Sequence, residues 1–285
     1  MLRPKPLDFL VFSILSLVFL PGCASKNTKI WSELSSPDSG SPEAIGTYSA
    51  GCLAGATSMY PDGVGFHVMR ISRKRFYGHP DLIQFITEVS KDVHQNKLGT
   101  LLVGDLAQAR GGPSPSGHAS HQTGLDVDIW FTTAEEYPGE QFSLSTRETL
   151  SAGKIVEQDK LDPNLWNKKK IKILQIFAQR PNVDRIFVTA AVKKDLCQRY
   201  DRFKKNKGWL SKIRPWFGHD DHFHVRLTCP KNSKTCYSSS DAILGTSCDQ
   251  TLEWWFSEEA KAVKPSEKAK EPDLPKRCMD ISKNS

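Results

Sequence analysis

The 285-residue sequence lacks the patterns of several common protein classes. It has no internal repeat, and no signature of a nucleic-acid-binding fold accompanies its formal net charge of +7. We therefore expect no nucleic acid among its partners. The HEXXH motif of helix-borne zinc proteases is absent. No cysteine neighbours a histidine at zinc-finger spacing, which argues against cysteine ligands to a metal.

The composition is that of an ordinary globular protein. Hydrophobic residues make up 38% and charged residues 25% of the chain, and its length allows a sizeable core. The positive charge is spread over lysine-rich patches, and a mildly basic surface suits an anionic polymer or an acidic membrane face.

The N-terminus predicts export. Arg3 and Lys5 precede an apolar run at residues 9–20, which is too short to span a bilayer comfortably and matches a signal peptide. The run ends in a sequence that resembles a bacterial lipobox, with Cys23 as the lipidated residue. Pro21 is unusual at its position, so cleavage without lipidation remains an alternative.

We expect residues 1–22 to be a lipoprotein signal peptide and residues 23–47 to be a polar tether to a membrane. Ala24, which follows Cys23 where an aspartate could stand, resembles a signal for outer-membrane sorting. The expected location is the periplasm, with an anchor in the outer membrane.

Six cysteines remain without Cys23, and an even number in an exported protein indicates disulfides. Six cysteines allow fifteen connectivities. Turn-forming residues at 230–235 favour one short bridge, and the two other pairs would tie down the termini. The expected pairs are Cys229–Cys236, Cys197–Cys248 and Cys52–Cys278.

Apolar periodicity predicts an α+β protein. Strands are expected at residues 66–71, 98–106, 125–131, 185–190 and 222–227, and helices at 80–93, 162–180 and 193–203. Pro80 would open the first helix, and Asp162 and Pro163 would be the N-cap and first residue of the second.

We expect one domain, residues 48–256, with a mixed or antiparallel sheet flanked by helices. Glycine-rich residues 51–65 and residues 132–160 would be irregular. Residues 257–285 would be an extended tail held by Cys278.

Two strands separate apolar from polar side chains. In the first, the apolar side chains share one face and the polar ones, with Trp130, the other: Leu125, Val127, Ile129 and Phe131 against Asp126, Asp128 and Trp130. In the second, His222 and His224 share a face opposite Phe223, Val225 and Leu227. If the strands are neighbours, His121, Asp128, His222 and His224 converge.

Two imidazoles and one carboxylate form a normal catalytic zinc set that leaves a position for water. Zinc lowers the pKa of such a water to roughly 7, and a further histidine could act as general base. A single histidine is more often structural, and Asp126 and Asp128 could be an exposed strand face. However, five of the eight histidines fall in two short clusters, which favours a metal site.

The spacing of His121, Asp128 and His222-x-His224 resembles the LAS metallopeptidases. Longer motifs closely resemble the penicillin-insensitive murein endopeptidase family: Gly104-Asp105, Arg110-Gly-Gly-Pro-Ser-Pro-Ser-Gly-His118, Ser120-His-Gln-Thr-Gly-Leu-Asp-Val-Asp-Ile129 and His219-x-x-His222-x-His224. The resemblance runs from about residue 46 to residue 278, and the six cysteines fit that family's three disulfides.

This resemblance implies a periplasmic LAS-type zinc hydrolase that cuts peptide cross-links of peptidoglycan between D-alanine and meso-diaminopimelate. It implies His121, Asp128 and His224 as zinc ligands. His222 would be the general base or would stabilise the oxyanion, and His118 and His219 would line the cleft. No serine nucleophile is needed, which would explain insensitivity to β-lactams.

Further candidates each have a structural alternative. Arg110 could bind a substrate carboxylate or form a salt bridge that holds its loop, and Trp216 could line the cleft or the core. Some family members hold a second metal, through a histidine at the position of His118 and a later Asp-x-x-His. The match here is Asp159-x-x-Asp162, which departs from that pattern.

Two other functions remain open. The protein could be a D,D-carboxypeptidase of the same zinc group, which trims the peptide end. It could also be a non-catalytic, cell-wall-binding lipoprotein with a structural metal. The presence of His118 and His222 argues against the last, because a closed structural site needs no spare histidines.

Overall fold

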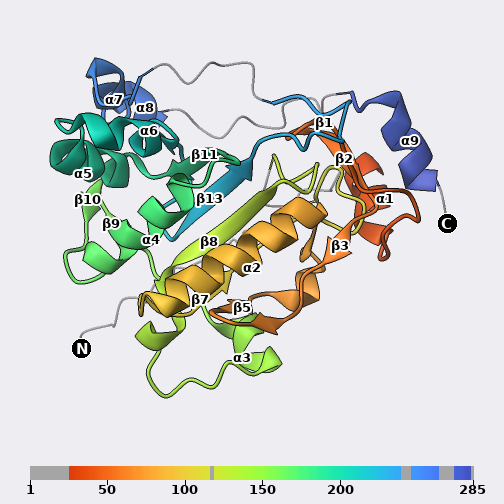
Figure 1. The fold of residues 1–285 in the computed structure, drawn as a ribbon, viewed down its shortest axis with the longest axis horizontal. Helices are drawn as coiled ribbons and strands as arrows, with labels where there is room; N and C mark the ends of the chain where they lie inside the picture. Colours follow the sequence, from red (N-terminus) through yellow and green to blue (C-terminus); the bar gives the residue numbers. More distant parts are fainter. Residues whose placement is uncertain (1–25, 116–118, 239–244, 263–272, 284–285) are drawn as a thin grey trace, which may run out of the picture.

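A mixed seven-stranded sheet is the centre of the computed structural model, which describes residues 26–115, 119–238, 245–262 and 273–283 (Figure 1). Across the sheet the strands lie in the order β12 (Ile213–Pro215), β11 (Val183–Val188), β13 (His222–Leu227), β8 (Asp126–Thr133), β7 (Leu101–Val103), β5 (Phe66–Val68) and β4 (Asp62–Gly63). The pairs β11–β12 and β5–β7 are parallel and the other pairs antiparallel. The α+β prediction is thus confirmed.

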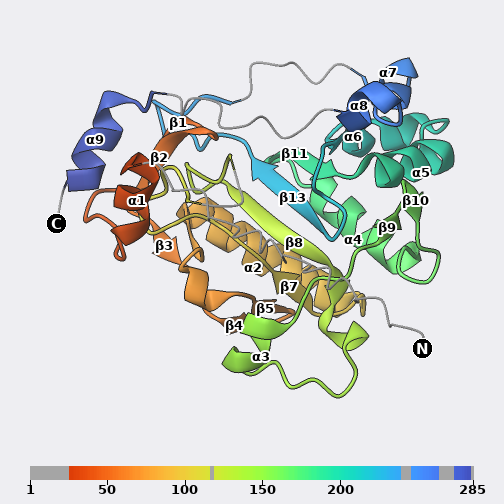
Figure 2. The same cartoon turned by 180° about the vertical axis from the view of Figure 1, so that it is seen from behind.

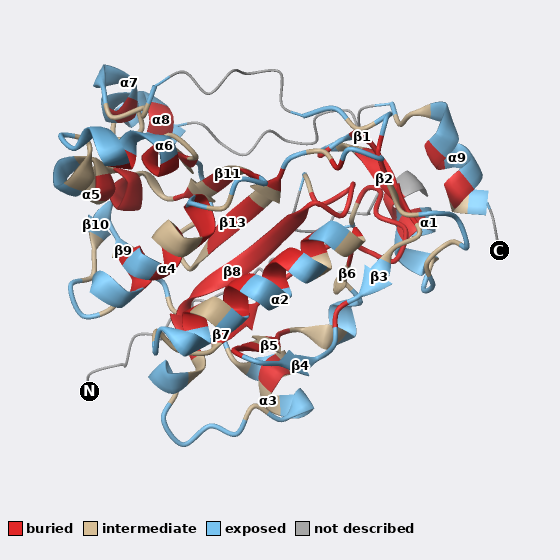
Figure 3. Cartoon of the chain, viewed as in Figure 1, coloured by how far each residue is buried: buried red, intermediate tan, exposed pale blue. Residues whose placement is uncertain are grey.

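Two helices, α2 (Pro80–Gln95) and α4 (Lys168–Ala178), pack on one face of the sheet. Figures 1 and 2 show α2 lying along β7 and β8, in front of the sheet in one view and behind it in the other. Pro80 is the first residue of α2, as predicted, and the buried side chains of the helix follow the expected spacing. Both helices contribute to the main core, whereas the solvent side of α2 is exposed (Figure 3).

The remaining elements surround this unit. The helices are α1 (Lys26–Glu33), α3 (Leu144–Thr149), α5 (Ala190–Tyr200), α6 (Lys207–Leu210), α7 (Gln250–Trp254), α8 (Glu258–Ala262) and α9 (Lys276–Lys283), with 3-10 turns η1 (Ile71–Arg73), η2 (Ala134–Glu136) and η3 (Lys204–Asn206). Short antiparallel pairs are β1 (Glu43–Thr47) with β2 (Ala50–Ala54), β3 (Thr57–Ser58) with β6 (Tyr77–Gly78), and β9 (Val156–Glu157) with β10 (Lys160–Leu161). Residues 51–65 and 132–160 are therefore more regular than predicted.

The expected tether at residues 23–47 is wrong for the part that is described. Residues 26–47 form α1 and β1, and Trp31 and Ile45 are buried in a small second core. This core also contains residues of β2 and α9, which gather with α1 at one end of the molecule (Figure 1). A few apolar side chains in a polar segment were enough to fold it, because β2 supplies a pairing partner for β1.

The expected extended tail is also wrong in part, since residues 258–262 and 276–283 are helical. Cys278 on α9 bonds to Cys52 on β2. The other bridges join Cys197 to Cys248 and Cys229 to Cys236. All three are the predicted pairs.

The second core helix begins later than predicted. Its N-cap is Asn167, whose side chain accepts hydrogen bonds from the backbone N–H of Lys169 and Lys170. The Asp162 carboxylate instead accepts from Asn164 N–H, and its carbonyl closes the turn that precedes the helix. Asp and Asn both suit an N-cap, so composition alone placed the boundary one turn too early.

Cys23, the predicted lipidation site, and the predicted signal peptide lie outside the described residues. In the described part of the chain, no helix combines the length and the apolar character needed to cross a membrane.

Candidate metal centre

The antiparallel pairing of β8 with β13 joins the two polar stretches. His224 lies directly opposite Asp128, and His222 lies opposite Trp130. Residues paired in this way project from the same face of the sheet. That face is opposite the main core, because the alternate residues Val127, Ile129 and Val225 belong to the core. The convergence predicted from alternation is therefore present.

His121 reaches the same place from the loop that leads into β8. Its backbone adopts a left-handed conformation with φ of 67°, which is uncommon for a residue other than glycine. The backbone N–H of His121 donates to an Asp126 carboxylate oxygen at 3.2 Å, which holds the turn against the strand. The His121 ring consequently meets the His224 ring edge to face, with 4.7 Å between centroids.

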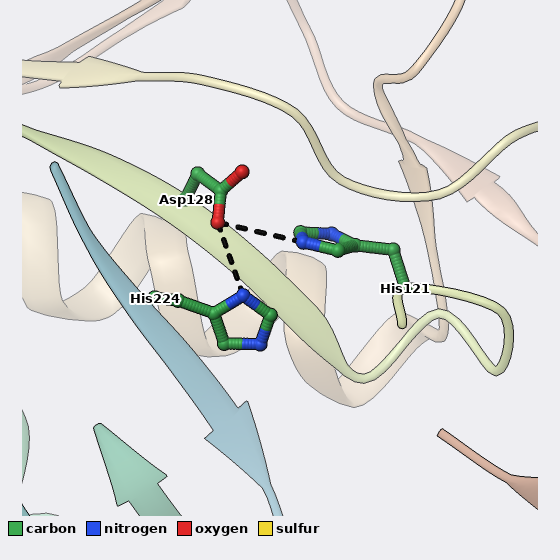
Figure 4. A group of neighbouring side chains, drawn as sticks. All are labelled: His121, Asp128 and His224. Atoms are coloured by element: carbon green, nitrogen blue, oxygen red, sulfur yellow. Dashed lines mark ion pairs between the residues drawn. The ribbon is translucent and has the colours of Figure 1, made fainter. Parts of the chain in front are cut away.

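His121, Asp128 and His224 form a buried group whose ligand atoms all lie within 4.8 Å of one another (Figure 4). Asp128 Oδ1 is 3.4 Å from His121 Nε2 and 3.2 Å from His224 Nδ1. Two ligands of a tetrahedral zinc, each about 2.0–2.1 Å from the ion, lie about 3.3 Å apart. The donor set and its spacing therefore fit a metal ion such as zinc.

Asp126, which is not one of the three candidate ligands, orients the ring of His224. Its Oδ1 lies 2.8 Å from His224 Nε2, and because an ionised carboxylate cannot donate, Nε2 carries the proton. In the neutral ring, Nδ1 then has a lone pair directed to the side of Asp128. A carboxylate that holds the outer nitrogen of a ligand histidine is a regular feature of metal sites. The sequence analysis missed this role, although Asp126 shares the strand face of Asp128.

Both aspartates remain ionised despite complete burial. Burial alone would raise the pKa of the Asp126 carboxyl, but Arg226 and His224 hold this pKa well below its usual range. The Nε of Arg226 donates to Asp126 at 2.8 Å. For Asp128 the cost of burial is outweighed by His121 and His222, which also hold its pKa low. A buried anionic site of this kind favours a cation.

His222 and His219 flank the three-residue group. His222 Nε2 is 3.8 Å from Asp128 Oδ1, and its Nδ1 is 2.5 Å from an Asp221 carboxylate oxygen. Burial opposes protonation of His222, but Asp128 and Asp221 raise its pKa above the usual value. His219 differs, because burial, with His224 and His222, lowers its pKa to about 3. His219 is thus neutral, whereas the neighbouring carboxylates favour protonation of His222.

A cavity of about 260 Å³ opens beside Asp128 and His222. Asp221 and Trp130 also line it, together with residues from η1 and from the segment after α3. The candidate metal group therefore has a neighbouring space in which a substrate could lie.

The sequence profile of a known family matches residues 44–283, and that family is described as penicillin-insensitive murein endopeptidase. The chain is a member of the penicillin-insensitive murein endopeptidase family. The resemblance seen in the motifs is confirmed.

Proteins named penicillin-insensitive murein endopeptidase are similar over nearly the whole length of this family member. One from Yersinia pestis is 38% identical over 254 residues, covering 89% of this chain and 90% of the relative. One from Haemophilus influenzae is 37% identical, covering 88% and 87%. One from Klebsiella pneumoniae is 37% identical, covering 93% and 95%.

Arg110, expected to bind a substrate carboxylate, has a structural role in this murein endopeptidase family member. Its side chain is buried, with 4% of the residue exposed. Its guanidinium donates to the backbone carbonyls of Ser36 and Ile281, and so joins the segment after α1 to α9. The expected role is wrong because segments around Ser36 and Ile281, which lie far from the motif in the sequence, bind this side chain.

Trp216 lies near the metal centre with its side chain largely exposed. Its ring contacts Phe187 at 5.9 Å between centroids, and Phe187 contacts His224 at 5.4 Å. Trp216 is therefore one ring removed from the site, and it is not a core tryptophan.

The residues suggested for a second metal have other partners. Asp159 pairs with Lys261 at 3.7 Å and Asp162 closes the turn before α4. His118 lies outside the described residues. Among the residues that are described, the group of His121, Asp128 and His224 is the one cluster suited to a metal.

Proposed function

We propose that this protein is a zinc-dependent murein endopeptidase that hydrolyses D-alanyl–meso-diaminopimelyl cross-links of peptidoglycan. The observation that carries the proposal is the buried group of His121, Asp128 and His224, in a chain that belongs to a murein endopeptidase family. Membership of this family supports an enzyme that acts on peptidoglycan. The donor set of two imidazoles and one carboxylate supports zinc and leaves a position for water.

In this proposal His121 Nε2, an oxygen of Asp128 and His224 Nδ1 hold the ion. Bound zinc supplies Lewis-acid polarisation of the scissile carbonyl and acidity of the attacking water. His222 accepts the proton of that water through Nε2, while Asp221 holds Nδ1 and fixes the ring. His219 lines the cleft in its neutral form, and its Nδ1 donates to the Phe217 carbonyl at 2.8 Å, which fixes the ring.

The cellular location follows from the N-terminus and belongs to the same proposal. A signal peptide at residues 1–22 directs the chain to the periplasm, and lipidation of Cys23 anchors it in the outer membrane. Three disulfides support an oxidising compartment such as the periplasm. Mass analysis of the mature N-terminus tests this part: a diacylglycerol on Cys23 supports the anchor, and an unmodified N-terminus contradicts it.

Digestion of purified sacculi with the protein, followed by mass analysis of the released muropeptides, tests the activity. We expect cross-linked dimers to disappear and uncross-linked monomers to accumulate. A chelator should stop the reaction, and added zinc should restore it. His121→Ala and Asp128→Ala should each lose both bound zinc and cleavage.

The other functions give different products. Loss of terminal D-alanine with intact dimers would show a D,D-carboxypeptidase. Binding to sacculi without any change in muropeptides would show a non-catalytic cell-wall protein. Full activity in either ligand variant would contradict the assigned metal site.

A further inference from the structure

The cavity beside Asp128 and His222 has two arginines in its wall, Arg70 and Arg73, which come from η1 and the residue before it. The side chain of Arg73 is 50% exposed, although its guanidinium is anchored at one end. In the part of the chain that the structure describes, the one hydrogen bond of this guanidinium is from Nη1 to Asp105 Oδ2, at 3.1 Å. The other N–H groups of Arg73 are thus available to a molecule in the cavity.

The anchor of Arg73 is tied directly to the metal centre. The Asp105 side chain is 3% exposed, and the Asp105 carbonyl accepts the backbone N–H of Asp128 at 3.0 Å. Arg75 donates to the same carboxylate oxygen at 3.0 Å. Two arginines therefore share one carboxylate oxygen, so that Asp105 holds one end of the Arg73 guanidinium and leaves the rest of this group at the cavity.

The turn that carries Arg73 is held rigidly. Arg70 and Lys74, on either side of η1, both have left-handed backbones, with φ of 56° and 54°. Non-glycine residues in this region persist where the surroundings impose it, and such positions cluster at functional sites. Here the Arg70 guanidinium donates to the carbonyls of Glu148 and Leu150, which fastens the turn to α3 and the segment after it.

Other charged groups in the wall already have partners. Asp105 is bound by the two arginines, and Asp221 by His222 Nδ1. The guanidinium of Arg70 is engaged by backbone carbonyls. Of the two arginines in the wall, Arg73 is the more exposed and makes the fewer hydrogen bonds, and it lies in the same cavity as Asp128 and His222.

We propose that Arg73 binds the carboxylate that the substrate carries next to the scissile amide, an inference that rests on the proposed endopeptidase function. In a D-alanyl–meso-diaminopimelyl link, the carbon attached to the scissile nitrogen bears a free carboxylate. A peptide bound with its scissile carbonyl at the metal centre has this carboxylate close to the reacting atoms. A guanidinium binds a carboxylate through two parallel hydrogen bonds, which fixes orientation as well as charge.

The test compares two synthetic peptides with a D-alanyl link, one with a carboxylate and one with a carboxamide on the carbon attached to the scissile nitrogen. kcat/KM is measured for zinc-loaded wild type, Arg73→Gln and Arg73→Lys. Lys74→Gln is the matched control, because it removes the same charge from the neighbouring exposed position. Zinc content and thermal unfolding show whether each variant keeps its metal and its fold.

Arg73→Gln should lower kcat/KM for the carboxylate peptide by roughly 10- to 100-fold, the range expected for hydrogen bonds to a charged group. It should change kcat/KM for the carboxamide peptide by less than about 3-fold, since the neutral amide makes no charged pair with the arginine. Arg73→Lys keeps the positive charge, so it should show part of the wild-type preference for the carboxylate peptide over the carboxamide peptide. Lys74→Gln should behave as wild type with both peptides.

An equal loss on both peptides would overturn the inference, because it would show a general role in folding or metal binding. An equal effect of Lys74→Gln would also overturn it, because bulk charge would then explain the preference. Wild-type protein that cleaves neither peptide nor sacculi would overturn the proposed function, and this inference with it. Wild-type cleavage without an Arg73-dependent preference would overturn the inference alone.

Discussion

At the scale of single residues, the metal centre depends on a carboxylate that binds no metal itself. Asp126 is fully buried and accepts hydrogen bonds from His224, Arg226 and the backbone of His121. It therefore fixes the position of two of the three ligand residues at once. A hydrogen-bond partner of this kind fixes the orientation of a ligand histidine and raises its basicity toward the metal.

Asp126→Asn should weaken zinc binding by about 10- to 100-fold, because the neutral amide holds His224 less firmly and no longer compensates Arg226. Competition with a fluorescent zinc chelator measures the affinity. Asp92→Asn is the control, since Asp92 is a half-exposed carboxylate that pairs with Arg180 away from the site. Equal zinc affinity of Asp126→Asn and wild type would contradict the role of Asp126.

His222→Ala should keep zinc while kcat falls by roughly 10²- to 10⁴-fold, the usual contribution of a general base. His222 lies outside the three-ligand group, and its Nε2 is 3.8 Å from the nearest oxygen of Asp128. Zinc content and muropeptide cleavage are measured on the same preparation. His67→Ala, which alters a histidine paired with Asp62, controls for loss of an imidazole. Unchanged turnover in His222→Ala would remove its role as base.

At the scale of elements, two arrangements matter. The pairing of β8 with β13 brings the site residues together. The disulfide between β2 and α9 links two elements of the small second core covalently. Arg110 links the same region through the carbonyls of Ser36 and Ile281. Residues 26–47 and 276–283 are consequently part of the folded unit, and Ser36 and Ile281 bind Arg110 in the loop that leads to the metal centre.

Removing the Cys52–Cys278 bridge should destabilise the protein more than removing Cys229–Cys236. The sequence separations are 226 and 7 residues. By restricting the unfolded chain, loops of these sizes stabilise the folded state by about 5 kcal/mol for Cys52–Cys278 and about 2.5 kcal/mol for Cys229–Cys236. Urea unfolding of the two double Cys→Ala variants measures the difference. The reverse order, or equal midpoints, would show that native-state contacts outweigh chain entropy here.

At the scale of the whole molecule, the metal centre connects distant parts of the chain. His121 lies on a loop, Asp128 on β8 and His224 on β13, so an ion bound to all three would bridge segments about a hundred residues apart (Figure 4). Such an ion binds the folded state, because the three ligands converge only there. Metal binding should therefore stabilise the entire fold.

Zinc at 100 times its dissociation constant should add about 2.7 kcal/mol to the free energy of unfolding. Calorimetry of chelated and zinc-loaded protein measures the corresponding rise in the melting temperature. His121→Ala should abolish the rise. A rise of the same size in this variant would show that zinc stabilises the protein elsewhere.

Local patterns predicted most of the central fold. The alternation in β8 and β13 specified which side chains face the core, and the spacing after Pro80 specified α2. Patterns failed where burial depended on distant partners. Residues 26–47 and 276–283 look polar, yet they fold because each covers apolar residues of the other region.

The sequence by itself indicated the family, because its long motifs consist of residue types at fixed spacings. Through that resemblance it also indicated the three metal-ligating candidates, and it favoured the disulfide pairs that the structure contains. Only the tertiary structure decided that Asp126 supports the site, that Arg110 does not face substrate, and that Arg73 does face the cavity. The physical reason is that a charged side chain takes its role from the groups it meets. Those groups come from segments whose proximity no local pattern encodes.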